Sequence, residues 1–185
     1  MSAKPAVLLV DDEPDMLSSL VGLLRREFEV HTAESGEQAL EIIAANEIDI
    51  LMTDQRMPGM TGSSLLQKVC EQDRVPVLIL FTGYADIKSV VDAVNTGQLF
   101  RYVTKPWDPD DLTELLHAAA TERRQRVVAD RLDAEASQCA ALGRDLVDQL
   151  RGAGDVAPIT LERFVGSCDR LAELCTSPDR DKTGE

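Results

Sequence analysis

Short apolar runs alternate with segments of helical periodicity over the first two thirds of the chain. Three runs are almost continuously apolar, at residues 6–10, 48–53 and 77–81. Strands that are covered on both faces of a parallel sheet have this composition. Two runs of more mixed composition, at residues 28–32 and 99–104, fit strands at the flanks of the sheet. The pattern therefore predicts five parallel strands.

Between these runs lie four segments with apolar residues every three or four positions, the spacing of an amphipathic helix. They are residues 14–27, 35–46, 62–72 and 86–96. Pro14 fits a first helical turn, and Gly97 fits a helix end. Five repeats of strand and helix, joined by right-handed crossovers, predict an α/β fold with a doubly wound parallel sheet between two helical layers.

A different pattern begins at Asp108, which fits a helix cap. No helix-breaking residue follows between residue 110 and about residue 142. Apolar residues recur at steps of three, four or seven, with Glu135 interrupting them: Val128, Leu132, Cys139, Leu142 and Leu146. This spacing fits a coiled coil, and it equally fits one long helix packed on a neighbour within the chain.

The remainder of the chain predicts a loop at residues 152–158 and a second amphipathic helix at residues 160–175. We therefore expect an α/β domain over residues 1–122, an all-α extension over residues 123–176, and a flexible polar tail over residues 177–185.

Charge narrows the possible partners. The net charge is −14, and residues 1–117 hold 9 basic against 20 acidic side chains. Such a surface repels phosphate backbones and anionic lipids, so direct binding to nucleic acid or membrane is not expected. The sequence has no run of about 18 apolar residues and no signal peptide. We expect a cytoplasmic protein.

The cysteines do not suggest a metal site. Cys70, Cys139, Cys168 and Cys175 lack the paired spacing of zinc ligands, and the chain has two histidines. Reduced thiols are the expectation in a cytosolic protein.

Acidic residues follow two of the predicted strands. Asp11, Asp12 and Glu13 come after the first strand, and Asp54 comes after the third. The carboxyl ends of parallel strands share one edge of the sheet, so these groups are expected to converge. Converging carboxylates favour a bound Mg²⁺. Taken alone, the same residues also fit an acidic surface loop at a helix start.

Two further strand ends favour a phosphoryl site. Thr82 ends the fourth strand and provides a hydroxyl, and Lys105 follows the fifth strand and provides a cation. A carboxylate nucleophile, a metal ion, a hydroxyl and an ammonium group together fit a site that accepts a phosphoryl group.

Four segments, in order, carry a resemblance to a known family: LLVDDEPDML, LMTDQRMPGMTG, LILFTGYAD and FRYVTKPWDPDDL. Over residues 5–122 the chain resembles the receiver domain of two-component response regulators, which has a flavodoxin-like fold. The resemblance implies that Asp54 accepts a phosphoryl group from a phosphohistidine of a sensor histidine kinase.

The resemblance also implies a set of metal ligands. Asp12, Asp54 and the backbone carbonyl of Arg56 would bind Mg²⁺ directly, and Asp11 would bind through a water molecule. Arg56 and Tyr84 are at positions that tune phosphoryl lifetime in the family.

Further roles follow from the same resemblance. Thr82 and Lys105 would hold the phosphoryl oxygens, and Tyr102 is at the position of the family's rotating aromatic switch. The Lys105–Pro106 bond matches a cis peptide of the family.

The output of the switch is left open between two interpretations. In the first, phosphorylation switches C-terminal helices that form a homodimer or bind a partner protein. In the second, the chain is the receiver and linker of a larger regulator, because its motifs resemble receivers of cyclic-di-GMP phosphodiesterases and of activators of hydrogenase genes. A third interpretation, an Mg²⁺-dependent phosphatase, lacks the DxD nucleophile motif. We expect the chain to catalyse only its own phosphorylation and dephosphorylation.

Overall fold

The computed structural model describes residues 4–72, 74–83, 99–151 and 158–176. Its strands are β1 (Ala6–Val10), β2 (Glu29–Ala33), β3 (Ile50–Asp54), β4 (Val77–Thr82) and β5 (Leu99–Thr104). Its helices are α1 (Pro14–Leu24), α2 (Gly36–Ala45), α3 (Gly62–Cys70), α5 (Pro109–Arg151) and α6 (Pro158–Thr176). The helix predicted at residues 86–96 lies outside the described residues.

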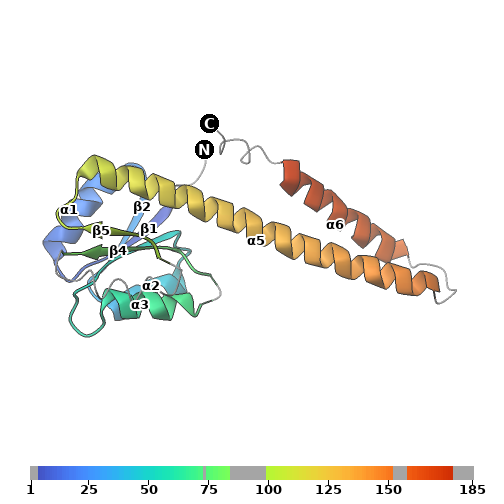
Figure 1. Cartoon of the computed structure of the whole chain (residues 1–185), viewed down its shortest axis with the longest axis horizontal. Helices are drawn as coiled ribbons and strands as arrows, with labels where there is room; N and C mark the ends of the chain where they lie inside the picture. Colours follow the sequence, from blue (N-terminus) through green and yellow to red (C-terminus); the bar gives the residue numbers. More distant parts are fainter. Residues whose placement is uncertain (1–3, 73, 84–98, 152–157, 177–185) are drawn as a thin grey trace. The chain divides into compact units, whose positions relative to one another are not determined.

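The five strands form one parallel sheet in the order β2-β1-β3-β4-β5. Helices cover both faces: α1 and the first part of α5 lie on one side, and α2 and α3 lie on the other (Figure 1). The predicted doubly wound, flavodoxin-like sandwich with a helical extension is confirmed.

Alternating strand residues feed two separate cores. Leu8 and Leu51 pack toward α2 and α3, whereas Val7 and Ile50 pack toward α1 and α5. Every residue of β1 and β3 is buried. Helices on both faces thus explain why these strands are continuously apolar in the sequence.

The third strand begins at Ile50 rather than at the predicted Ile48. The reason is Asp49, whose carboxylate accepts a hydrogen bond from the Ala6 backbone N–H at 3.0 Å. The Asp49 backbone N–H also donates to the Ala6 carbonyl at 2.9 Å. Asp49 therefore holds the start of β1, and the regular strand begins after it.

The chain divides into two compact units, residues 1–123 and 124–185, called here the α/β unit and the helical unit. In the α/β unit, α5 buries Leu112, Leu116 and Ala119 against the sheet. As expected, Asp108 caps the helix: its carboxylate accepts from the Asp110 N–H at 2.9 Å.

In the helical unit, the rest of α5 packs against α6 as a hairpin, and Leu142 is buried. The helix runs through Gly143 and ends at Arg151, directly before the predicted loop at residues 152–158. An interior glycine costs only about 1 kcal/mol. Moreover, a Cβ on Gly143 would lie 3.4 Å from the Phe164 ring, so this glycine leaves room for α6. The side chains of Leu146 and Cys175 lie outside the described part. None of the helices, over the residues described, is long and apolar enough to cross a membrane.

Candidate functional site

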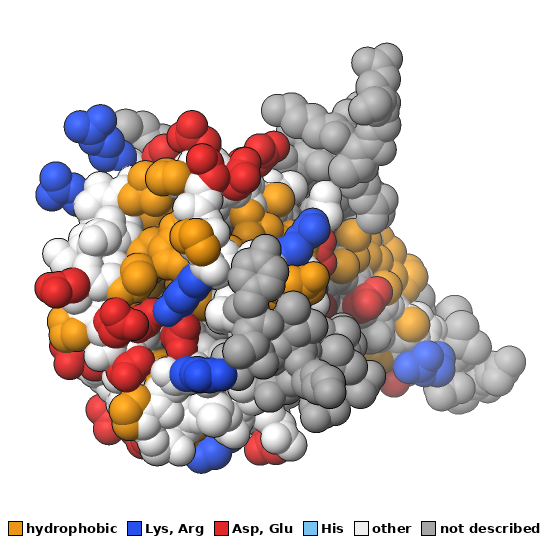
Figure 2. Space-filling model, turned by 60° about the vertical axis from the view of Figure 1, so that its left-hand side comes forward, with side chains coloured by type: hydrophobic (Ala, Val, Ile, Leu, Met, Phe, Trp, Pro, Cys, Tyr) orange, Lys and Arg blue, Asp and Glu red, His pale blue; other side chains and the backbone are white. Residues whose placement is uncertain are grey.

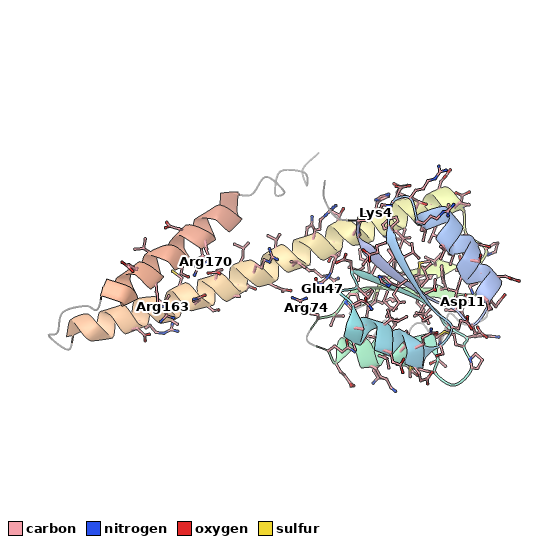
Figure 3. The ribbon with its side chains drawn as sticks, turned by 180° about the vertical axis from the view of Figure 1, so that it is seen from behind. Lys4, Asp11, Glu47, Arg74, Arg163 and Arg170 are labelled. Atoms are coloured by element: carbon pink, nitrogen blue, oxygen red, sulfur yellow. The ribbon has the colours of Figure 1, made fainter. Side chains whose placement is uncertain are left out.

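Three charged side chains meet at the carboxyl edge of the sheet. Asp11 directly follows β1, Asp54 is the last residue of β3, and Lys105 directly follows β5. Figure 3 shows Asp11 at the opposite end of the α/β unit from the ion pair of Glu47 and Arg74. Parallel strands bring residues distant in sequence to this one edge, as the sequence predicts.

Lys105 joins the two carboxylates. Its Nζ lies 2.8 Å from Asp11 Oδ2 and 2.6 Å from Asp54 Oδ1. Asp11 is 1% exposed and Asp54 is 7% exposed, so each carboxylate needs a compensating cation. Burial lowers the pKa of Lys105, but hydrogen bonds to Asp11 and Asp54 and their negative charges outweigh it and raise that pKa above its ordinary value. Lys105 is thus held in its charged form.

The second oxygen of the Asp54 carboxylate is held by the backbone. The Arg56 N–H donates to Asp54 Oδ2 at 2.5 Å. The start of α3 also presses on this residue, because a Cβ on Gly62 would lie 2.2 Å from the Asp54 carbonyl oxygen. Only a residue without a side chain fits at this close approach.

Gln55 clamps the loop that follows Asp54, a contribution that sequence reasoning missed. Its backbone carbonyl accepts from the Gly62 N–H at 3.1 Å. Its Oε1 accepts from the Ser63 N–H at 3.0 Å, and its Nε2 donates to Ser63 Oγ at 3.1 Å. Gln55 is 6% exposed. A large polar residue directly after a buried strand was the available signal.

Aromatic side chains form a wall of the site. Phe81, paired with Asp54 in the register of β3 and β4, lies 5.6 Å from Lys105 Nζ, measured to the ring centroid. Its ring stacks on Trp107 with centroids 4.7 Å apart. The cation therefore lies near an apolar surface that limits its hydration.

The other predicted site residues lie at the same edge or near it. Thr82 is 1% exposed, and its hydroxyl donates to the Gly83 carbonyl at 3.1 Å. Asp12 is exposed, and Tyr102 on β5 is 50% exposed. The Lys105–Pro106 peptide is cis, as the resemblance implies. Tyr84 lies outside the described residues.

The donor chemistry of the edge fits a hard cation. Within the described ranges, no group of three or more His, Cys, Asp or Glu side chains is arranged to hold a metal ion. Asp11 and Asp54 are nevertheless drawn together around one positive charge. Carboxylate and carbonyl oxygens with retained waters are the ligands that Mg²⁺ takes, so Asp54 and the backbone carbonyl of Arg56 fit as direct ligands and Asp11 fits as a ligand through water.

Figure 2 shows acidic side chains in several places on the face it presents, with hydrophobic and basic side chains between them. The acidic side chains of residues 1–117 are thus partly buried at the strand ends, as Asp11 and Asp54 are, and partly spread over the surface.

Comparisons with known proteins agree with this geometry. The family model described as response regulator receiver domain matches residues 7–117. The signal receiver domain of an HD domain-containing protein from Pseudomonas fluorescens is 32% identical, with a TM-score of 0.64 over 68% of this chain and 93% of that one. The response regulator TrrA from Thermotoga maritima, solved with Mg(2+)-BeF, is 29% identical, with a TM-score of 0.56 over 62% of this chain and 98% of that one.

Curated relatives match over part of their length. The hydrogenase transcriptional regulatory protein HoxA of Cupriavidus necator is 35% identical over 73% of this chain, which spans 28% of that protein. Strand order, the paired carboxylates bridged by a lysine, and these matches agree. The chain belongs to the response regulator receiver domain family.

Proposed function

We propose that the chain is a response regulator of a two-component phosphorelay in the cytoplasm, in which Asp54 accepts a phosphoryl group from a sensor histidine kinase. The observation that carries the proposal is the Lys105 ammonium between the buried carboxylates of Asp11 and Asp54, 2.6 Å from the latter. A cation beside the acceptor can neutralise the charge that arrives with the phosphoryl group.

In the proposed reaction, an Asp54 oxygen attacks the phosphorus of the phosphohistidine, and the P–N bond breaks as the O–P bond forms. Mg²⁺, when bound by Asp12, Asp54 and the Arg56 carbonyl, with Asp11 through water, supplies further neutralisation of phosphoryl charge. Lys105 holds one phosphoryl oxygen. In this proposal the chain catalyses only its own phosphorylation and dephosphorylation.

The proposed switch uses Thr82 and Tyr102. The Thr82 hydroxyl donates to the neighbouring Gly83 carbonyl, and in the proposed switch it turns from there to a phosphoryl oxygen. Tyr102, which is half exposed, would then move inward toward the position that the Thr82 hydroxyl leaves. The new hydrogen bond of Thr82 and the inward movement of Tyr102 would together shift the population between two states of the protein.

We propose that the signal is read by α5 and α6, through homodimerisation or through a partner protein. An alternative is favoured by the curated relatives: they are named as transcriptional regulators, and the chain spans 28% to 32% of HoxA and of DctD from Rhizobium meliloti. In that case the helices connect the receiver domain to an output domain.

Labelling with a small phosphodonor and Mg²⁺ tests the phosphoacceptor. Asp54→Asn should abolish labelling, because an amide is not a nucleophile toward phosphorus. Asp15→Asn, which changes an exposed carboxylate in the first turn of α1, should label as the wild type does. Chelation of Mg²⁺ should suppress labelling of both active proteins.

Undiminished labelling of the Asp54→Asn variant would place the acceptor elsewhere. Light scattering on the same samples tests the output. A change of mass on phosphorylation of the full chain, absent from residues 1–122 alone, supports dimerisation by the helices. An unchanged monomer in both states excludes the homodimer.

A further inference from the structure

Two cysteine thiols face each other across the hairpin of the helical unit. Cys139 on α5 and Cys168 on α6 have their Sγ atoms 3.3 Å apart. A disulfide has an S–S separation of about 2.05 Å, so the two sulfur atoms must come closer by a little over 1 Å for a bond to form. Both cysteines are free and partly buried.

Contacts on both sides of the pair fix the register of the two helices. One turn before Cys139, the Glu135 carboxylate accepts bonds from Arg170 Nε at 3.1 Å to both of its oxygens. Figure 3 shows Arg170 between α6 and α5. One turn after Cys139, Gly143 lies against the Phe164 ring. The thiols are therefore held opposite each other rather than meeting by chance.

The polar contact beside the pair is itself enclosed. Ser167, next to Cys168, is fully buried and donates to the Glu135 carboxylate at 3.3 Å. An exposed ion pair by itself contributes little to holding two helices in register. The buried Ser167 hydroxyl binds the same Glu135 carboxylate, and this hydrogen bond is lost when the two helices separate.

We propose that Cys139 and Cys168 are a dithiol modification site, which a low-molecular-weight disulfide oxidises to a disulfide that ties α5 to α6. A thiolate of the pair attacks one sulfur of the small disulfide and expels one small thiolate. The second cysteine loses its proton and attacks the protein sulfur of the mixed disulfide, expelling the other small thiolate. Two protein thiols are oxidised by two electrons, and one small disulfide is reduced to two thiols.

The hydrogen bond with Cys139, together with burial and the charge of Asp169, raises the pKa of Cys168, so its thiolate is scarcer at neutral pH than that of an ordinary thiol and the exchange is slower. The disulfide would close a loop between residues 29 apart in sequence and would oppose separation of the two helices. This site is independent of the phosphoacceptor.

The test is oxidation of the full chain with oxidised glutathione at about pH 8.5, where an ordinary thiol is half ionised. Acid quenching, alkylation and tryptic mapping without reductant follow. The four cysteines fall in separate tryptic peptides, which span residues 69–74, 132–144, 164–170 and 171–180. We expect one cross-link, between 132–144 and 164–170, in a monomer, with the mass of both peptides less two hydrogens and reversed by dithiothreitol.

Two variants sharpen the test. Cys70→Ser should keep the cross-link, whereas Cys139→Ser should leave Cys168 as a glutathione mixed disulfide. In the oxidised wild type, the helical transition in far-ultraviolet circular dichroism should move to higher temperature. Free thiols or mixed disulfides at both positions, or a cross-link between two copies of the 132–144 peptide, would overturn the proposal.

Discussion

The α/β unit and the helical unit are each stabilised by a different kind of internal contact. In the α/β unit, whole strands are buried and two apolar cores flank one sheet. In the described part of the helical unit, the buried side chains are Leu142 and Ser167, and polar contacts between Glu135 and Arg170 add to them. Stability from apolar burial scales with area, so the α/β unit should be the more stable of the two.

The chain carries a probe that separates the two units. Trp107 is its single tryptophan and lies in the α/β unit, stacked on Phe81. Tryptophan fluorescence therefore reports unfolding of the α/β unit, whereas far-ultraviolet circular dichroism reports both units.

The largest expected effect comes from the same substitution made in each unit. Leu8→Ala in β1 should lower the free energy of unfolding by about 4 kcal/mol, because it removes a fully buried side chain and leaves a cavity in the core. Leu142→Ala should lower the free energy of unfolding of the helical unit by about 2 kcal/mol. In urea it should shift only the transition seen by circular dichroism. If Leu142→Ala shifted the fluorescence transition as much as the dichroism transition, the two units would unfold as one.

A smaller effect tests the close approach of α3 to β3, the strand that ends at Asp54. Gly62→Ala should cost about 3 kcal/mol, since its Cβ would meet the Asp54 carbonyl oxygen at 2.2 Å and Leu80 at 2.8 Å. The matched control is Gly22→Ala in α1, which has no atom within 4 Å of an added Cβ. This control should gain up to about 1 kcal/mol from helix propensity. Fluorescence-monitored urea unfolding measures both, and a neutral Gly62→Ala would refute the crowding.

The smallest effect concerns the lysine bridge. Lys105→Met should cost about 2 kcal/mol, because it leaves two carboxylates without their shared cation, and the partial exposure of Lys105 limits the loss. The folded-state pKa of Lys105 is raised, so its contribution is complete below its ordinary pKa and disappears as pH rises through the raised value.

The difference in unfolding free energy between wild type and the Lys105→Met variant should therefore stay constant from about pH 7 to pH 10 and shrink above that range. Urea unfolding across this range measures it. A difference that instead grows with alkaline pH would contradict the pairing.

Much of the α/β unit could be predicted because buried strands and strand ends leave local signals. The convergence of Asp11, Asp54 and Lys105 follows from parallel topology alone. The facing positions of Cys139 and Cys168 could not be predicted in this way, because they depend on the register of α6 against α5. The clamp of Gln55 likewise depends on where α3 begins, which side-chain periodicity locates only within a few residues.

The Gln55 clamp has a consequence for how this protein can change. Its three hydrogen bonds to Gly62 and Ser63 close the two ends of the loop 56–61 on each other, next to Asp54, the proposed phosphoacceptor. A loop that is fastened at its base can exchange its outer residues without moving the strand behind it. Arg56, in that loop, holds Asp54 through its backbone N–H, so a change of its exposed side chain leaves that donor available to the carboxylate while the loop stays fastened.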